Sequence, residues 1–242
     1  MPATGTLEEA QVRAMFDRIA GLYDLMNSVM TAGLHHRWRR RAVDLAEVPR
    51  DGRALDVASG TGDLALELAG RMGPGGEVIG TDFSERMLEL ARAKAAARAG
   101  DRSGAEVRFE VGNALSLPYE DSSFDAATVG FGARNFSDLS RGLSEMTRVV
   151  RPDGRVVVLE ITTPTRPPLS HFFELWFDRV VPKLGRVAGD PEAYSYLPRS
   201  VRRFPGPRDL AELMSRSGMR RVRYVVTAGG IIALHVGEVA PR

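Results

Sequence analysis

The sequence contains no cysteine, and this absence excludes disulfide bonds, thiolate metal ligands and a cysteine nucleophile together. Long apolar runs are also missing, since no stretch approaches the roughly 20 residues that a helix needs to cross a bilayer. The N-terminal segment shows no basic region followed by an apolar one. We therefore expect no signal peptide and a cytoplasmic protein.

An excess of charge of one sign is lacking as well. The formal net charge is +2 over 242 residues, and the basic residues do not gather into the stripe that is typical of nucleic-acid-binding proteins. We therefore expect no nucleic-acid partner. The apolar fraction of 43% and the charged fraction of 26% are those of an ordinary globular protein, long enough to bury a sizeable core.

The middle of the chain alternates between strand-like and helix-like patterns. Strands are predicted over 53–58, 76–82, 106–112, 124–130 and 154–162, and helices over 62–71, 84–98 and 136–150. Such alternation indicates βαβ units, and hence a parallel sheet with helices on both faces.

The two ends of the chain depart from this pattern. Residues 8–46 show apolar residues at helical spacing, and Gly21 and Gly33 are expected to divide the region into short helices. Residues 168–184 look helical and aromatic, 185–205 look irregular, and a helix is predicted over 207–217. Two strands, 219–227 and 230–238, follow. The short turn between them makes an antiparallel hairpin.

The segment from Leu55 to Asp63, LDVASGTGD, predicts a glycine turn between a strand and a helix. Asp56 lies on the strand, and Gly60, Thr61 and Gly62 begin a G-x-G-x-x-A pattern. Glycine lets the backbone turn sharply and lets a ligand approach closely. Alone this motif is weak, because many such turns bind nothing.

The ends of the next two strands also carry suitable side chains. Asp82, followed by Phe83, stands 22 residues after the first glycine of the turn, where it can accept hydrogen bonds from ribose hydroxyls. Ser84 is better placed than Asp82 to cap the next helix. Asn113 and Ala114 follow the third strand, where an adenine ring would pass, although a plain Asx turn is the alternative for Asn113. Ligands of open α/β sheets bind at these carboxyl ends.

Two cofactors suit such a site. A nicotinamide dinucleotide would use the same turn and acidic residue, but a dehydrogenase usually needs a second substrate domain, and too little chain remains. A Rossmann-like, mostly parallel seven-stranded sheet with a C-terminal antiparallel hairpin favours the class I methyltransferases. The expected cofactor is therefore S-adenosylmethionine, with S-adenosylhomocysteine as its product. No spacing of His, Asp and Glu suggests a metal.

Over nearly its whole length the chain resembles the ubiquinone/menaquinone biosynthesis C-methyltransferase family. The specific matches are YDLMN (23–27), FGARN (131–135) and YSYLPRSVRRFP (194–205). Membership implies methyl transfer to a ring carbon of a prenylated quinol but does not by itself choose the quinol. We expect demethylmenaquinol. The alternatives are 2-methoxy-6-polyprenyl-1,4-benzoquinol as substrate, or a non-catalytic S-adenosylmethionine-binding partner in a quinone-synthesis assembly.

The resemblance also implies where the chemistry takes place. Arg134 follows the fourth strand, where its charge can stabilise a phenolate or hold a water molecule that takes the proton, and Asn135 can orient the substrate oxygen. Tyr23 lies on the N-terminal helical segment, and Asp24 or His35 is the candidate general base. Weaker candidates are Tyr194, Tyr196 and His235.

The same reading divides the chain into a helical cap over the substrate site, 1–48, and a core, 49–242, with a helical insertion at about 165–205. The aromatic helix 168–184 and the apolar N-terminal segment are expected to line a channel for the prenyl tail, with simple core packing as the alternative. Arg37, Arg39, Arg40 and Arg41 favour transient contact with the inner face of the cell membrane. A homodimer is left open.

Overall fold

The computed structural model describes residues 9–31, 33–98, 104–181 and 191–241. Its centre is a seven-stranded sheet of order β3-β2-β1-β4-β5-β7-β6. The strands from β3 to β5 in this order pair in parallel, whereas β7 runs antiparallel to both β5 and β6. The strands are β1 (Arg53–Val57), β2 (Glu77–Asp82), β3 (Glu106–Val111), β4 (Phe124–Gly130), β5 (Val150–Ile161), β6 (Met219–Thr227) and β7 (Ile232–Val239).

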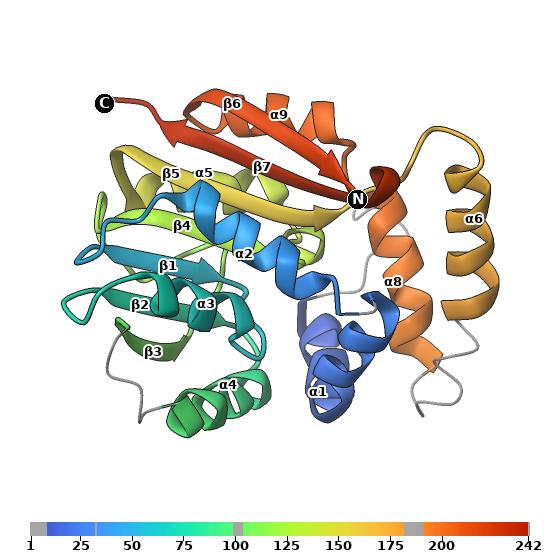
Figure 1. Ribbon diagram of the computed structural model, residues 1–242, viewed down its shortest axis with the longest axis horizontal. Helices are drawn as coiled ribbons and strands as arrows, with labels where there is room; N and C mark the ends of the chain where they lie inside the picture. The colour runs from blue at the N-terminus through green and yellow to red at the C-terminus, as the bar shows by residue number, and fades with distance from the viewer. Residues whose placement is uncertain (1–8, 32, 99–103, 182–190, 242) are drawn as a thin grey trace.

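Helices cover both faces of this sheet (Figure 1). Consecutive strand residues point to opposite faces, so Ala54 packs in one apolar cluster and Leu55 in the other. The first cluster includes residues of α2, α3 and α4, and the second includes residues of α5 and α9. These helices are α2 (His35–Ala46), α3 (Asp63–Arg71), α4 (Glu85–Arg98), α5 (Leu139–Val149) and α9 (Pro207–Arg216).

The predicted alternation of strands and helices is confirmed, as is the C-terminal hairpin, whose turn is the short 3-10 helix η3 (Ala228–Gly230). Among the strands, the predicted and observed boundaries differ most at β5. Strand β5 begins at Val150 rather than at 154, because Val150 still pairs with Phe124 across an irregularity in the ladder.

The N-terminal helix α1 (Glu9–Thr31) runs without a break through Gly21, so the prediction that Gly21 divides it is wrong. A glycine inside a helix costs only about 1 kcal/mol, and buried residues on the N-terminal side, Val12 and Met15, hold the helix in place. Gly33 does separate α1 from α2, since its φ of +75° is left-handed and favours glycine.

The predicted aromatic helix is present as α6 (Leu169–Leu175), which continues into the π-helical turn η2 (Trp176–Val180). The last part of that prediction, 182–184, lies outside the described residues. The prediction of irregular structure over 185–205 is wrong for the helix α8 (Pro191–Arg203). Pro198 inside α8 obscured the helical pattern. Tertiary packing stabilises the helix, since Val201 packs against Phe173 and Phe177.

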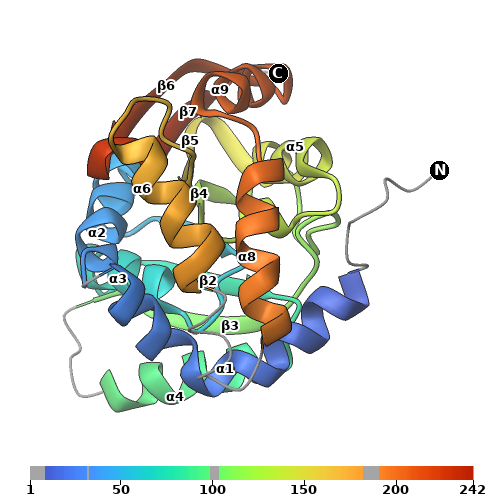
Figure 2. The same ribbon diagram turned by 90° about the vertical axis from the view of Figure 1, so that its right-hand side faces the viewer.

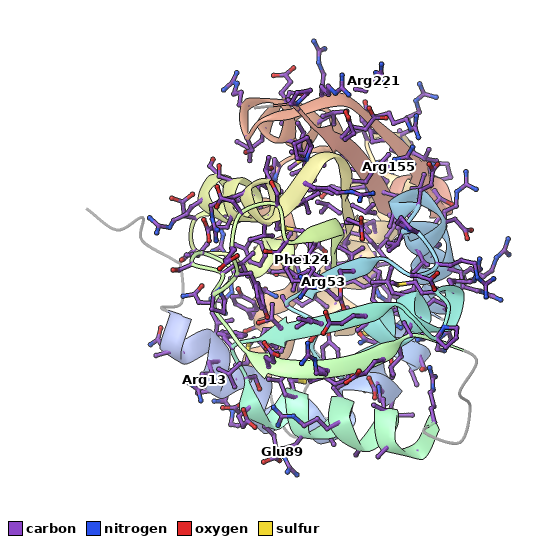
Figure 3. All side chains as sticks on the ribbon, turned by 90° about the vertical axis from the view of Figure 1, so that its left-hand side faces the viewer. Arg13, Arg53, Glu89, Phe124, Arg155 and Arg221 are labelled. Carbon is purple, nitrogen blue, oxygen red and sulfur yellow. The ribbon has the colours of Figure 1, made fainter. Side chains whose placement is uncertain are left out.

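Helices α1, α6 and α8 lie together beyond the carboxyl ends of the parallel strands (Figures 1 and 2). The opposite end of the sheet, seen in Figure 3, carries charged side chains, and there Arg53 lies 5.1 Å from the centre of the Phe124 ring. Ligands of open α/β sheets bind at the carboxyl ends of the strands. We therefore expect the site between these strand ends and helices α1, α6 and α8. Within the described ranges, no helix combines the length and the apolar character that crossing a membrane requires.

Candidate active site

The glycine turn after β1 gives its two glycines different tasks. Both have left-handed φ angles, +54° at Gly60 and +82° at Gly62. A Cβ on Gly62 would lie 2.7 Å from the Phe109 ring and 2.9 Å from Ala91, so Gly62 allows the turn to pack against β3 and α4. No described atom lies within 4 Å of the Cβ position at Gly60. Gly60 lines a cavity, and Gly62 does not.

Asp82 ends β2 and ties two turns together. Its Oδ2 accepts the Gly60 N–H at 2.8 Å and its Oδ1 accepts the Ser84 N–H at 2.9 Å. Burial raises the pKa of Asp82 to about 6, although these backbone hydrogen bonds oppose the shift. Ser84 caps α4 as predicted, since its Oγ accepts the Met87 N–H at 3.1 Å.

Asp56 on β1 is a second buried carboxylate at this cavity. Its Oδ1 accepts the Thr128 hydroxyl at 2.7 Å, whereas its Oδ2 is buried and has no hydrogen-bond partner among the residues that the structure describes. Burial raises the pKa of Asp56 to about 7. A buried acceptor without a partner costs free energy, so this oxygen suits a ligand that brings a donor.

The remaining cofactor-binding predictions fall on the same cavity: its wall includes Thr61, Phe83, Asn113 and Ala114. Asn113 also forms the Asx turn that was its alternative, because its Oδ1 accepts the Leu115 N–H at 2.8 Å. Two carboxylates, an open space at a glycine and loops from three strand ends fit the amino, hydroxyl and adenine groups of S-adenosylmethionine. No cluster of three or more His, Asp or Glu suited to a metal ion occurs within the described ranges.

Two carboxylates of helix α1 bind the turns that follow β1 and β2. Asp24 accepts the Thr61 hydroxyl at 2.6 Å and forms an ion pair with Lys94 at 2.5 Å. Closer to the N-terminus, Asp17 accepts the Ser84 hydroxyl at 2.5 Å. Both carboxylate oxygens of Asp24 are thus engaged, and the structure gives it a role in holding α1 over the glycine turn.

A second cavity, of about 380 Å³, lies beside the first and is mainly apolar. Aromatic side chains of α1, α2, α6 and η2 form much of its wall. The two cavities share Phe16, Tyr23, Arg39 and Phe131. Phe131 has a φ of +61°, a strained conformation that tends to occur at functional sites. A ligand in the apolar cavity would therefore meet the cofactor at this shared wall.

Arg134 lies on the short 3-10 helix η1 (Ala133–Asn135) and reaches the apolar cavity. Its Nη1 is 2.8 Å from Glu160 Oε1 and also donates to the Phe131 carbonyl. Burial is the largest single effect and disfavours its charge, but the charge of Glu160, the hydrogen bond to Glu160 and the nearby Tyr23 and Tyr196 together raise the pKa of Arg134 above its ordinary value. The ion pair between Arg134 and Glu160 is buried. Arg134 is therefore not a surface arginine whose only role is an exposed ion pair.

His35, at the start of α2, also lines the apolar cavity. Its Nδ1 lies 2.7 Å from the Thr31 hydroxyl. Burial, followed by the charges of Arg39 and His36, lowers the pKa of His35 to about 4. The imidazole is therefore neutral near pH 7 and keeps one ring nitrogen without a proton, but the lowered pKa makes it a weaker base than an ordinary histidine.

Asn135 lines the cofactor cavity, and its Oδ1 lies 3.2 Å from the Tyr196 hydroxyl. Tyr196 itself is buried and lines the apolar cavity. His235 lies apart from both: it stacks on Tyr224, and its Nε2 is 2.8 Å from the Pro207 carbonyl, as a packed histidine would be. The side chain of Tyr194 lies outside the part that the structure describes.

Sequence reasoning missed three charged residues of the site. Glu160 stands in the apolar run VVVLEI, where an isolated carboxylate is the signal of a buried partner. Lys94 binds both Asp24 and Asp63. Arg39, expected to face a membrane, is instead buried and lies 3.0 Å from Asp63, so that expectation is wrong for Arg39.

The sheet order, with β7 antiparallel between β5 and β6, and a cofactor cavity at the strand ends define a class I methyltransferase. A solved S-adenosylmethionine-dependent methyltransferase from Thermotoga maritima, described as a possible histamine N-methyltransferase, has this fold. It matches with a TM-score of 0.62 at 21% identity, over 93% of this chain and 98% of that one.

The chain belongs to the ubiE/COQ5 methyltransferase family, whose model matches residues 4–239. A demethylmenaquinone methyltransferase of Thermus thermophilus is 48% identical over 93% of this chain and 99% of its own. One from Deinococcus radiodurans is 47% identical over 94% of this chain and 92% of its own. A ubiquinone/menaquinone biosynthesis C-methyltransferase of Citrifermentans bemidjiense is 40% identical over 94% of this chain and 95% of its own. The protein is thus an S-adenosylmethionine-dependent C-methyltransferase.

Proposed function

We propose that this enzyme methylates a ring carbon of demethylmenaquinol to form menaquinol. The observation that carries the proposal is the apolar, aromatic-walled cavity that shares Tyr23 and Phe131 with the cofactor cavity. It offers a prenylated ring an apolar site next to the methyl donor. The names of the relatives that are 48% and 47% identical support the naphthoquinol over the benzoquinol.

S-adenosylmethionine, when bound, supplies a methyl group already activated on a sulfonium. The enzyme's own task is to align a ring carbon with that methyl group and to make the carbon nucleophilic by favouring loss of the hydroxyl proton. Arg134 stabilises the oxyanion that results. His35, which is neutral and lines the same cavity, accepts the hydroxyl proton directly or through one water molecule. After methyl transfer the methylated ring carbon loses its own proton, which restores the aromatic ring, and the oxyanion regains a proton. Asp56 and Asp82 hold the cofactor.

The test is methyl transfer from labelled S-adenosylmethionine to chemically reduced demethylmenaquinone under anaerobic conditions. We expect labelled menaquinol. Faster labelling of 2-methoxy-6-polyprenyl-1,4-benzoquinol would support the ubiquinone alternative. Tight cofactor binding without turnover of either quinol would support a non-catalytic partner instead.

Arg134→Ala should lower turnover by about 100-fold or more, as loss of an oxyanion donor does, and should leave the Kd for S-adenosylmethionine nearly unchanged. Arg155→Ala is the matched control, because Arg155 pairs with Glu47 at 2.5 Å at the opposite end of the sheet. Equal losses of turnover and cofactor affinity in Arg134→Ala would assign Arg134 to cofactor binding.

We also propose that the apolar cavity opens towards a membrane surface. The helices that form its wall expose large apolar side chains: Leu25 and Val29 of α1 are 59% and 58% exposed, and Phe172 and Leu175 of α6 are 56% and 48% exposed. Helices α1 and α6 lie on the same side of the molecule (Figure 2). Such side chains suit insertion among lipid headgroups, from which a prenylated quinol would arrive.

Cosedimentation with vesicles of phosphatidylcholine and phosphatidylglycerol tests this contact. Phe172→Ser with Leu175→Ser should weaken binding at least tenfold, because each inserted apolar side chain contributes about 1.5–3 kcal/mol. Tyr224→Ser with Val226→Ser on β6 is the control, since both residues are exposed to 42% and neither lines the cavity. Equal binding by wild type and both variants would refute the contact.

A further inference from the structure

Glu160 lies near the end of β5 and is only 1% exposed. Its carboxylate accepts hydrogen bonds from three groups of the protein. Oε1 accepts Nη1 of Arg134 and the Ile161 N–H, both at 2.8 Å, and Oε2 accepts the backbone N–H of Arg134 at 3.2 Å. Because two of these donors are backbone amides, one on β5 and one on η1, the carboxylate is held from two elements.

This arrangement orients the Arg134 guanidinium. Glu160 and the Phe131 carbonyl both bind the same nitrogen, Nη1. The Nε atom of Arg134 is buried and has no partner among the described residues. Arginine carries donors only, and a buried donor that lacks an acceptor points to a ligand that supplies one. Arg134 lines the apolar cavity, where an oxygen of the bound ring can supply an acceptor to the guanidinium.

We propose that Glu160 is a positioning residue that holds the Arg134 guanidinium as the oxyanion donor of the apolar cavity. The inference rests on the proposed function, because the oxyanion is that of the quinol. Glu160 acts through Arg134 and does not itself touch the substrate. The other titratable groups on this cavity are Tyr23 of α1, His35 and Arg39 of α2 and Tyr196 of α8.

The charge of Glu160 allows a decisive test. Its negative charge and its positioning of Arg134 have opposite effects on the pKa of a phenol bound in the cavity. A negative charge beside the cavity disfavours a second anion, so if Glu160 acted only as a counter-charge, its removal would make a bound phenol more acidic. If Glu160 positions Arg134, its removal lets the guanidinium leave the oxyanion, and the bound phenol becomes less acidic.

The experiment measures the pKa of 1-naphthol bound together with S-adenosylhomocysteine, by the absorbance of the naphtholate. This probe needs no turnover, so it stays informative even if demethylmenaquinol is not the substrate. Wild type should lower the naphthol pKa relative to free naphthol. Arg134→Ala and Glu160→Gln should each raise the bound pKa by about one unit or more relative to wild type, and the double variant should raise it no further than Arg134→Ala alone.

Asp125→Asn is the matched control, because Asp125 also pairs with an arginine, Arg151 at 2.6 Å, and accepts a backbone amide, that of Arg53, at 2.6 Å. It should leave the bound pKa unchanged. Glu160→Asp, which keeps the charge but shortens the side chain, should shift the pKa in the same direction as Glu160→Gln, and it serves if Glu160→Gln does not fold.

Several outcomes would overturn the inference: a more acidic naphthol in Glu160→Gln, additive shifts in the double variant, a wild-type value in Glu160→Asp, or no lowering of the naphthol pKa by wild type. With demethylmenaquinol as substrate, Glu160→Gln should lower kcat at least tenfold and leave the Kd for S-adenosylmethionine unchanged. Absence of turnover by wild type, with the naphthol shifts intact, would refute the proposed substrate and leave the role of Glu160 standing.

Discussion

Two buried carboxylates face the cofactor cavity, and both hold a proton more tightly than an exposed aspartate does. Burial raises the pKa of Asp56 to about 7 and that of Asp82 to about 6. In the unliganded protein both are therefore partly protonated in mildly acidic solution. Ligand groups that donate hydrogen bonds favour the ionised form, so cofactor binding is coupled to the release of protons.

We predict that the Kd for S-adenosylmethionine falls as the pH rises through 6 and 7 and then levels off. The sign follows because below these values the carboxylates must first lose a proton before they can accept hydrogen bonds from the ligand. Calorimetric titrations in buffers of different ionisation enthalpy would detect the released protons. In Asp56→Asn the dependence near pH 7 should disappear, and that near pH 6 should remain. A Kd that rises with pH would contradict this account.

Asp24 offers a second test at this scale. Its ion pair with Lys94 and its bond to Thr61 assign it to cofactor-site structure, whereas the sequence also allowed a general base. Asp24→Asn should weaken S-adenosylmethionine binding about tenfold and leave the pH dependence of kcat unchanged. Loss of the acidic limb of the kcat profile with normal cofactor affinity would make Asp24 the base.

At the scale of elements, α1 is an uninterrupted helix that contains one destabilising residue, Gly21. It closes over the cofactor cavity through Phe16 and Tyr23, yet it contains Gly21 in its middle. Gly21 is exposed, and no described atom lies within 4 Å of its Cβ position. A side chain is therefore tolerated there, and glycine only lowers the stability of the helix.

Gly21→Ala should raise the free energy of unfolding by about 0.5–1 kcal/mol, since alanine loses less backbone entropy in a helix. Urea denaturation would measure the change. Gly62→Ala is the contrasting variant: its φ of +82° and the ring of Phe109 at 2.7 Å make it destabilising. A Gly21→Ala protein less stable than wild type would show that α1 needs flexibility at this position.

At the scale of the whole molecule, the cofactor cavity joins the sheet to the helices beyond its carboxyl ends. Its wall draws Asp56 and Asp82 from the sheet and Phe16 and Tyr23 from α1. A ligand that contacts both parts stabilises the folded state as a unit, by about 2.7 kcal/mol at a concentration 100-fold above its Kd.

S-adenosylhomocysteine at that excess should therefore raise the Tm by several degrees. The sheet and the helices beyond it should then unfold together in a single thermal transition. Scanning calorimetry with and without ligand would measure the shift. Asp17→Asn with Asp24→Asn, which removes both ties of α1, should reduce the shift at the same ligand concentration. An unchanged shift would mean that α1 contributes nothing to cofactor binding.

Much of the core could be predicted because the signals are local. Strand periodicity, the glycine turn and the Ser84 cap each depend on residues close in sequence, and the structure contains all three. The errors have a common cause. Gly21 was expected to end a helix and α8 was expected to be irregular, because local propensity ignores the packing that stabilised both, as Val201 against Phe173 illustrates.

The sequence by itself predicted the part of the first cavity's wall that the strand ends supply, because Gly60, Asp82 and Asn113 stand at the ends of consecutive strands, and parallel strands bring their carboxyl ends to one edge of the sheet. Only the tertiary structure decided which charged residues pair around the two cavities. Glu160 of β5 meets Arg134 of η1, Lys94 of α4 meets Asp24 of α1, and Arg39 of α2 turns inward to Asp63 of α3. Such ion pairs depend on which distant segments become buried together, and no local pattern records that choice.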